Sequence, residues 1–246
     1  MKATFAGANI KGTPSMKAPA VKHDLNVLRR IADVFVVQEF KWTWYWTTMV
    51  GVLVGWSSYP SHFLGTVRPI EAANAIFWKR KLFKKLKTFS RPAFDFDLDN
   101  AGIMDNRWIK AVLLQSKLDK FTAWYLTTHF VVGGDEITDS PRRRRFMGQN
   151  IERLDEVLEI LQNSGYPICG ELDANIHKDT WAYQNLMSVL RAHGAKVHGQ
   201  HGVEYAFTIN GRHGTWTDVK PSVIPTSQLK TDHEIRVLDW TGKERP

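Results

Sequence analysis

The chain has 246 residues, 43% of them hydrophobic and 24% charged, which suits one large α/β domain or two small ones. It contains no run of 18 apolar residues and its first residues lack the apolar core of a signal peptide, so we expect no membrane span and a cytoplasmic location. The single cysteine, Cys169, excludes an internal disulfide. A net charge of +8 favours a polyanionic partner, nucleic acid before an anionic membrane.

Short apolar runs in the first half of the chain predict strands, with one amphipathic helix among them. The run "ADVFVVQEF" (32–40) is continuously apolar before its polar end, as in a strand buried on both faces. A helix is indicated by Val21, Leu25, Leu28 and Ile31, which share one face at helical spacing. In chain order the expected strands cover 4–10, 32–40, 74–81, 107–117 and 120–132.

The second half begins with the best-marked helix, expected over 140–163. Ser140 can cap it, Pro141 suits its first turn, and apolar residues recur at spacings of four and three from Met147 to Leu161. Strands are expected within 168–177 and over 203–210, 215–224 and 233–240, and a second helix over about 180–193. Strands outnumber helices and come from both ends of the chain, which favours a single α/β domain over 1–246 with two packed sheets and outer helices.

Polar residues follow many of these apolar runs. The stretch "ICGELDANIH" (168–177) places Glu171, Asp173 and Asn175 at alternate positions, so on one face of an extended chain. Two carboxylates that lie so close together repel one another and are costly to bury, so a purely structural design would avoid them. Other polar residues that follow or open strands are Asn9, Glu39, His129, Asp218 and the pair Asp232–His233. Because a rigid scaffold aims side chains at strand ends, this repeated placement favours an active site.

The segment "TDHEIRVLD" (231–239) carries the sharpest pattern. Asp232 and His233 can both reach a mouth from the first residues of a strand, and we expect Asp218 in "TWTDVK" to orient His233 by accepting a ring N–H. A carboxylate that holds an imidazole in one tautomer is a common acid–base arrangement. Glu39 with Asp232 offers oxygen ligands for Mg²⁺, which keeps several waters and binds phosphate oxygens.

The order of these motifs resembles the endonuclease/exonuclease/phosphatase superfamily, which includes deoxyribonuclease I-like and exonuclease III-like members. The resemblance rests on "ANI", "DVFVVQE", "TTHF", the acidic turn at 170–175, "TD" within a strand and the closing "TDH", and it covers roughly residues 4 to 239. Each motif is short, so their order and spacing carry the specificity. The resemblance implies a four-layer α/β sandwich, deoxyribonuclease I-like in fold, and Mg²⁺-dependent hydrolysis of phosphate esters, with Mn²⁺ as the alternative cation.

The resemblance also implies roles for the metal ligands and the closing histidine. Asn9 and Glu39 would help to hold the metal, with Asp232 nearby. His233, oriented by Asp218, would contact the scissile phosphate and move protons.

Phosphate-binding roles are implied for His129 and for Arg107, which heads a predicted strand. Glu71 lies loosely where some members keep a carboxylate partner for the mid-chain histidine. The run "PRRRR" (141–145), which includes Arg144 and Arg145, is interpreted as a contact to nucleic-acid backbone or as a solvated helix end. Positive charge at a helix N-terminus is mildly unfavourable, which tilts this choice towards function.

The acidic turn departs from the family pattern Gly-Asp-x-Asn and leaves two registers open. Alignment on Gly170 gives Glu171 the role of the Asp and Asp173 that of the Asn. Alignment on chemistry gives Asp173 and Asn175 these roles, as water-activating base and phosphate-binding amide, with Leu172 in place of the Gly. A shift of two residues keeps the same strand face, so geometry alone does not choose. We favour Asp173 and Asn175, with Glu171 as an extra carboxylate near the metal.

The sequence therefore predicts a metal-dependent phosphodiesterase acting on nucleic acid, DNA before RNA, by in-line attack of an activated water. Three tryptophans after Glu39, in "KWTWYWTT" (41–48), are interpreted as core packing or as a platform for bases: Trp42, Trp44 and Trp46. Two alternatives stay open on the same fold. One is a phosphatase of inositol lipids or small phosphoesters, and the other is a catalytically inactive nucleic-acid-binding protein.

Overall fold

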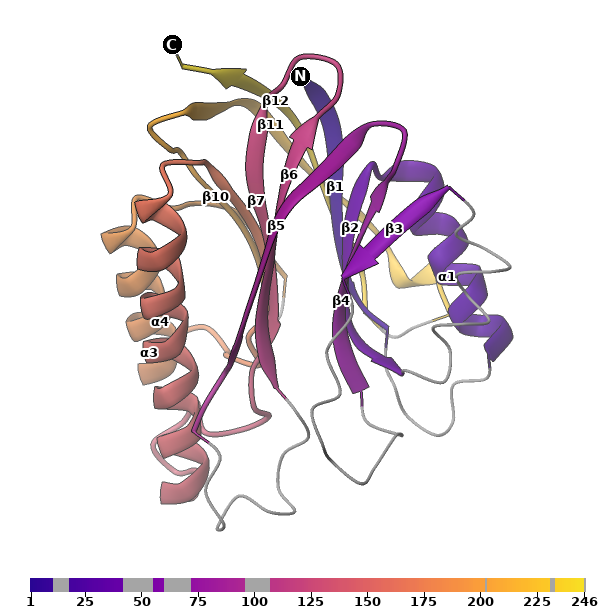
Figure 1. Cartoon of the computed structure of the whole chain (residues 1–246). Helices are drawn as coiled ribbons and strands as arrows, with labels where there is room; N and C mark the ends of the chain where they lie inside the picture. Colours follow the sequence, from indigo (N-terminus) through magenta and orange to yellow (C-terminus); the bar gives the residue numbers. More distant parts are fainter. Residues whose placement is uncertain are drawn as a thin grey trace.

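The computed structural model describes residues 1–10, 18–41, 55–59, 72–95, 107–201, 203–230 and 233–245 (Figure 1). The strands are β1 (Lys2–Asn9), β2 (Val34–Lys41), β3 (Trp56–Tyr59), β4 (Ala72–Lys79), β5 (Phe83–Pro92), β6 (Trp108–Ser116), β7 (Thr122–His129), β8 (Ile168–Asp173), β9 (Lys196–His201), β10 (Glu204–Ile209), β11 (Gly214–Ile224) and β12 (Ile235–Glu244). The helices are α1 (Ala18–Ile31), α3 (Pro141–Asn163) and α4 (Trp181–Ala192), with a short 3₁₀ turn, η2 (Thr226–Gln228).

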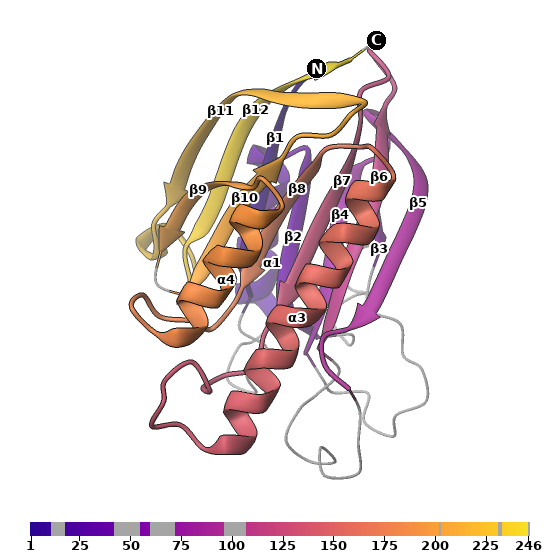
Figure 2. The same cartoon turned by 90° about the vertical axis from the view of Figure 1, so that its left-hand side faces the viewer.

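The strands form two mixed sheets packed face to face. Sheet A has the order β11-β12-β1-β2-β4-β3, and sheet B has the order β5-β6-β7-β8-β10-β9. Helix α1 covers the outer face of sheet A, while α3 and α4 lie side by side on the outer face of sheet B (Figures 1 and 2). The predicted four-layer α/β sandwich is therefore confirmed.

Local sequence accounts for the helices that position these layers. Ser140 caps α3 by accepting a hydrogen bond from the Arg143 backbone N–H, and Pro141 takes the first helical position. On α1 the predicted face is buried at Val21, Leu25 and Leu28. None of the helices in the described ranges combines the length and apolar character needed to cross a membrane.

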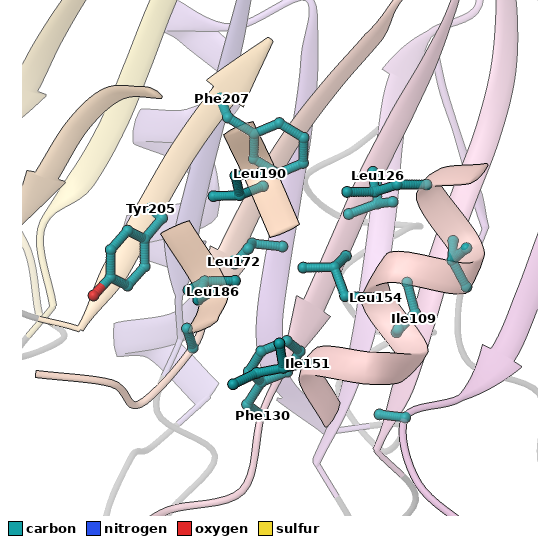
Figure 3. Packing of buried hydrophobic residues seen from close by; sticks show 14 of the residues in the cluster. Ile109, Leu126, Phe130, Ile151, Leu154, Leu172, Leu186, Leu190, Tyr205 and Phe207 are labelled. Atoms are coloured by element: carbon teal, nitrogen blue, oxygen red, sulfur yellow. The ribbon is translucent and has the colours of Figure 1, made fainter. Parts of the chain in front are cut away.

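Three apolar clusters fill the spaces between the layers. One lies between sheet B and its two helices and includes Leu126, Leu154 and Leu186 (Figure 3). A second, between the sheets, includes the single cysteine, Cys169, and a third lies under α1. Five tryptophans are buried in the sandwich, which makes them core residues: Trp56, Trp78, Trp124, Trp216 and Trp240.

Strands β3, β5 and β9 were not predicted from the sequence, and all three lie at sheet edges. On β5, "FKKLKTFSRP", four successive residues from Lys84 to Lys87 are exposed, so the inward–outward alternation of a strand is weak. Lysines on an edge strand oppose pairing with other chains. Strand β12 begins at Ile235, so His233 precedes the strand that was predicted to contain it.

Candidate active site

Several of the predicted polar residues converge because parallel strands end at the same edge. β1 runs parallel to β2 with Asn9 beside Gln38, and β7 runs parallel to β8 with His129 beside Asp173. These two strand pairs belong to opposite sheets, and their ends meet at the end of the sandwich away from both termini (Figure 1). We call this end the mouth.

Asp173 lies at the centre of the group. Its Oδ2 accepts a hydrogen bond from Asn9 Nδ2 at 2.5 Å and lies 3.5 Å from His129 Nε2. Burial raises the pKa of Asp173, while the Asn9 hydrogen bond and the electrostatic influence of His233 and Arg107 act against that rise. The other oxygen, Oδ1, is buried and accepts no hydrogen bond from the described residues. This carboxylate thus has an open ligand position.

A β-bulge aims Glu39 at the same point. Between Val37 and Phe40 the β2–β4 register shifts by one residue, and Glu39 takes a left-handed backbone conformation with φ of 54°. Such a conformation costs a non-glycine residue about 1–3 kcal/mol, and strained residues of this kind cluster at functional sites. Its Oε1 lies 3.7 Å from His129 Nε2, and its side chain is 23% exposed.

His129 and Arg107 add a neutral imidazole and a positive charge to the group. Burial lowers the pKa of His129 well below its usual range, and the charges of Arg107 and His233 lower it further. His129 is therefore a neutral imidazole at neutral pH. Arg107 also acts on the pKa of Asp173, so its charge is felt across the predicted phosphate site.

His233 is held by a residue that the sequence did not single out. Its Nδ1 donates to Glu204 Oε1 at 3.0 Å, and Glu204 is the cross-strand neighbour of Asp173. Asp173, Glu204 and His233 each offer one ligand atom, and these three atoms lie within 4.8 Å of one another. The signal for Glu204 was present in "VEYAFTIN", where a carboxylate opens an otherwise apolar strand.

The prediction that Asp218 orients His233 is wrong. Asp218 lies in a bulge of β11 with φ of 52°, is 59% exposed, and has its Oδ1 3.6 Å from Lys220 Nζ. It faces a groove of about 440 Å³ that is also lined by Lys2, the first residue of β1. Since β1 ends at Asn9, the length of that strand, about 20 Å, separates Asp218 from the mouth.

Glu171 does not take the metal-ligand role predicted for it. Its side chain is 0% exposed, its Oε2 accepts from Gln38 Nε2, and its Oε1 lies 3.5 Å from Arg236 Nε. A carboxylate whose oxygens both face N–H groups between the sheets is an interior residue. At the mouth stands Asp173, two residues further along β8, which favours the register of Asp173 and Asn175.

Asn175 follows the end of β8 in a left-handed conformation with φ of 51°. It is half-buried, and its Nδ2 donates to the Phe130 carbonyl at 3.1 Å. This contact ties the loop after β8 to the loop after β7, so Asn175 lies beside the end of the strand that carries His129.

Arg144 and Arg145, also predicted to bind phosphate, lie in the first turns of α3, which packs on the outer face of sheet B (Figure 2). Arg145 lies over the Phe146 ring at 5.2 Å. Backbone hydrogen bonds to the Asp139 carboxylate are the main cause that lowers its pKa, and the charge of Arg144 lowers it further. Asp232, Glu71 and the three tryptophans after Glu39 lie outside the described residues.

No protein-family model and no curated protein matches this sequence. Solved structures do match the fold. An endonuclease/exonuclease/phosphatase from Bacteroides vulgatus aligns with a TM-score of 0.75 and 12% identity, over 99% of this chain and 100% of that one. The chain therefore has the fold of the endonuclease/exonuclease/phosphatase proteins, as its motif order predicts.

Two further structures share this fold and differ in what they act on or bind. A mannosyl-6-phosphatase of Bacteroides thetaiotaomicron aligns with a TM-score of 0.72 and 11% identity, over 97% of this chain and 99% of that one. The D. rerio TDP2, complexed with a single-strand DNA product, aligns with a TM-score of 0.69 and 10% identity, over 98% of this chain and 99% of that one. At these identities the likeness concerns the fold.

Proposed function

We propose that this chain is a divalent-metal-dependent phosphodiesterase that hydrolyses nucleic acid. The observation that carries the proposal is the meeting of Asn9, Glu39 and Asp173 with His129 at one mouth, beside His233 held by Glu204. Oxygen ligands, an oriented imidazole and a neutral buried imidazole are the parts needed for metal-assisted attack on phosphate.

The residues fit a hard cation such as Mg²⁺ or Mn²⁺. Asp173 Oδ1 is a buried carboxylate oxygen that accepts no hydrogen bond from the described residues, and the Glu39 carboxylate is part exposed in the same mouth. Asn9 and Glu39 would hold the ion, with Asp173 adjoining them and Asp232 as a further candidate. A bound cation supplies charge neutralisation at the phosphate oxygens.

The chain's own residues supply proton transfer and phosphate binding. Asp173, with a pKa raised by burial, is the proposed acceptor of a proton from the attacking water. His233 donates its Nδ1–H to Glu204, which leaves Nε2 to exchange a proton at a phosphoryl oxygen. Arg107, His129 and Asn175 are the proposed phosphate-binding groups.

Nucleic acid, and DNA before RNA, is the proposed substrate because the chain carries a net charge of +8. TDP2, which shares the fold, was crystallised with a single-strand DNA product. A second candidate is a small phosphoester, since a mannosyl-6-phosphatase also has this fold.

Incubation with plasmid DNA, linear DNA, RNA, mannose 6-phosphate and a soluble inositol phosphate, each with Mg²⁺, Mn²⁺ or EDTA, tests the proposal. We expect cleavage of nucleic acid that EDTA abolishes and that His233→Ala removes while the melting temperature is kept. Cleavage that survives EDTA would contradict the proposed dependence on a divalent metal ion. Turnover of the small esters alone would favour the phosphatase, and salt-dependent DNA binding without turnover would indicate an inactive binding protein.

A further inference from the structure

One buried arginine joins the two sheets directly beneath the mouth. Arg236 belongs to β12 of sheet A and is 4% exposed. Its Nε lies 3.5 Å from Oε1 of Glu171, on β8 of sheet B, and its Nη2 pairs with Oε2 of Glu204, on β10 of sheet B. A single guanidinium thus bridges two carboxylates of the opposite sheet.

The backbone around this pair leaves room for it. Gly7 is the cross-strand partner of Arg236 on β1, and a Cβ added at Gly7 would overlap the carboxyl group of Glu171. Gln38 closes the other side, since its Nε2 donates both to Glu171 Oε2 and, at 2.8 Å, to Thr127 Oγ1. The Arg236–Glu171 pair is therefore enclosed by residues of five strands, β1, β2, β7, β8 and β12.

The same inner faces are apolar one step further from the mouth. Leu238 follows Arg236 on the inner face of β12, and Cys169 precedes Glu171 on that of β8, and both belong to the apolar cluster between the sheets. Replacing a buried ion pair by apolar residues of similar volume is often neutral or stabilising. Stability alone therefore does not explain why an arginine and a glutamate occupy these two positions.

Glu204 supplies the explanation. Its two oxygens have different partners, because Oε2 meets Arg236 and Oε1 accepts from His233 Nδ1 at 3.0 Å. A carboxylate held at only one oxygen can rotate and lose the geometry of the other contact. With Arg236 on Oε2, the remaining oxygen stays directed at the imidazole.

Resting on the function proposed above, we propose that Arg236 is a positioning residue that holds Glu204 against His233, with Glu171 as its second buried partner. In this arrangement Arg236 touches neither substrate nor metal. It acts through Glu204 on the tautomer and direction of the His233 ring, and outer partners of this kind typically contribute about 10–100-fold to activity.

The test combines ring nitrogen NMR of His233 with steady-state kinetics on DNA. Arg236→Met removes the guanidinium, Arg236→Lys keeps one charge without the fork, and Glu171→Leu/Arg236→Met replaces both polar side chains of the pair by apolar ones. Arg91→Met is the matched control, because Arg91 pairs with Glu156 on the surface at 2.7 Å. The NMR readout needs no turnover, so it still tests the positioning role if the wild-type protein hydrolyses no nucleic acid, a result that would refute only the proposed function.

We expect Arg236→Met to lower kcat about 10–100-fold with KM close to that of the wild type, and to lose the fixed Nδ1–H tautomer of His233. Arg236→Lys should lose less, and Arg91→Met should change neither readout. The double variant should regain the melting temperature that Arg236→Met loses, but not its kcat or its tautomer. A double variant with wild-type kcat, or an unchanged tautomer in both Arg236→Met proteins, would overturn the proposal and leave the pair a structural role.

Discussion

Glu171 makes the stability of this protein depend on pH in a direction that can be worked out from its surroundings. Burial raises its pKa from an ordinary value of 4.5 to about 7, although Arg236 and Gln38 lower it. Between these two values the folded protein keeps a proton that the unfolded chain has released. The free energy of unfolding therefore falls as pH rises through this window, and the loss is complete above about pH 7.

Glu171→Gln removes this titration and keeps the shape of the side chain. At 1.36 kcal/mol for each unit of pKa, the variant should gain about 2–3 kcal/mol of unfolding free energy relative to the wild type between pH 5 and pH 8. The difference between the two proteins isolates Glu171, since all other titrating groups are shared.

Urea unfolding in EDTA at half-unit steps from pH 5 to pH 8.5 measures that difference. Glu156→Gln, which removes a surface carboxylate of α3, controls for the loss of one negative charge. If the stability difference between wild type and Glu171→Gln is the same at pH 5 and pH 8, Glu171 is ionised throughout and the argument from burial fails.

Three further predictions concern turnover and binding. Glu204→Gln should lower kcat on DNA by about 10²–10⁴, because the His233 imidazole loses its anionic partner. Asp218→Asn should leave kcat unchanged. Equal losses in the two variants would restore the role first predicted for Asp218. Asp173→Asn should be nearly inactive and Asn175→Ala should lose about 10²–10³ in kcat, while an active Asp173→Asn enzyme would favour the other register of the turn. Replacing the four arginines of 142–145 together by alanine should flatten the salt dependence of DNA affinity measured by fluorescence anisotropy, and an unchanged slope would assign them to a solvated helix end.

Gly7→Ala supplies a fifth prediction, on packing between the sheets. The added methyl group would overlap the carboxyl group of Glu171, and overpacking of a core typically costs about 1–3 kcal/mol. Thermal unfolding should show this loss. The double variant Gly7→Ala/Glu171→Ala should lose less stability than the sum of the losses in the two single variants. Additive effects of the two substitutions would show that the space at Gly7 is not reserved for that side chain.

Local sequence determined the helices and most of the strands, because their signals lie within a few residues of one another. Ser140 and Pro141 mark the start of α3, and the continuous apolar run of β2 marks a buried strand. The same logic brought Asn9, His129 and Asp173 together, since residues that end parallel strands share an edge.

Only the tertiary structure decided which carboxylate holds His233 and where Glu171 points. Glu204 opens an antiparallel strand, and the start of such a strand lies at the same edge as the end of its neighbour, a pairing that the sequence does not reveal. In the sequence Asp218 looked as suitable a partner for His233 as Glu204, but the antiparallel register of β11 with β12 places it at the opposite end of the sandwich. Glu171 and Arg236 belong to different sheets and are 65 residues apart in sequence. Their contact depends on how the two sheets pack, and on Gly7, whose missing side chain leaves room for the Glu171 carboxyl group.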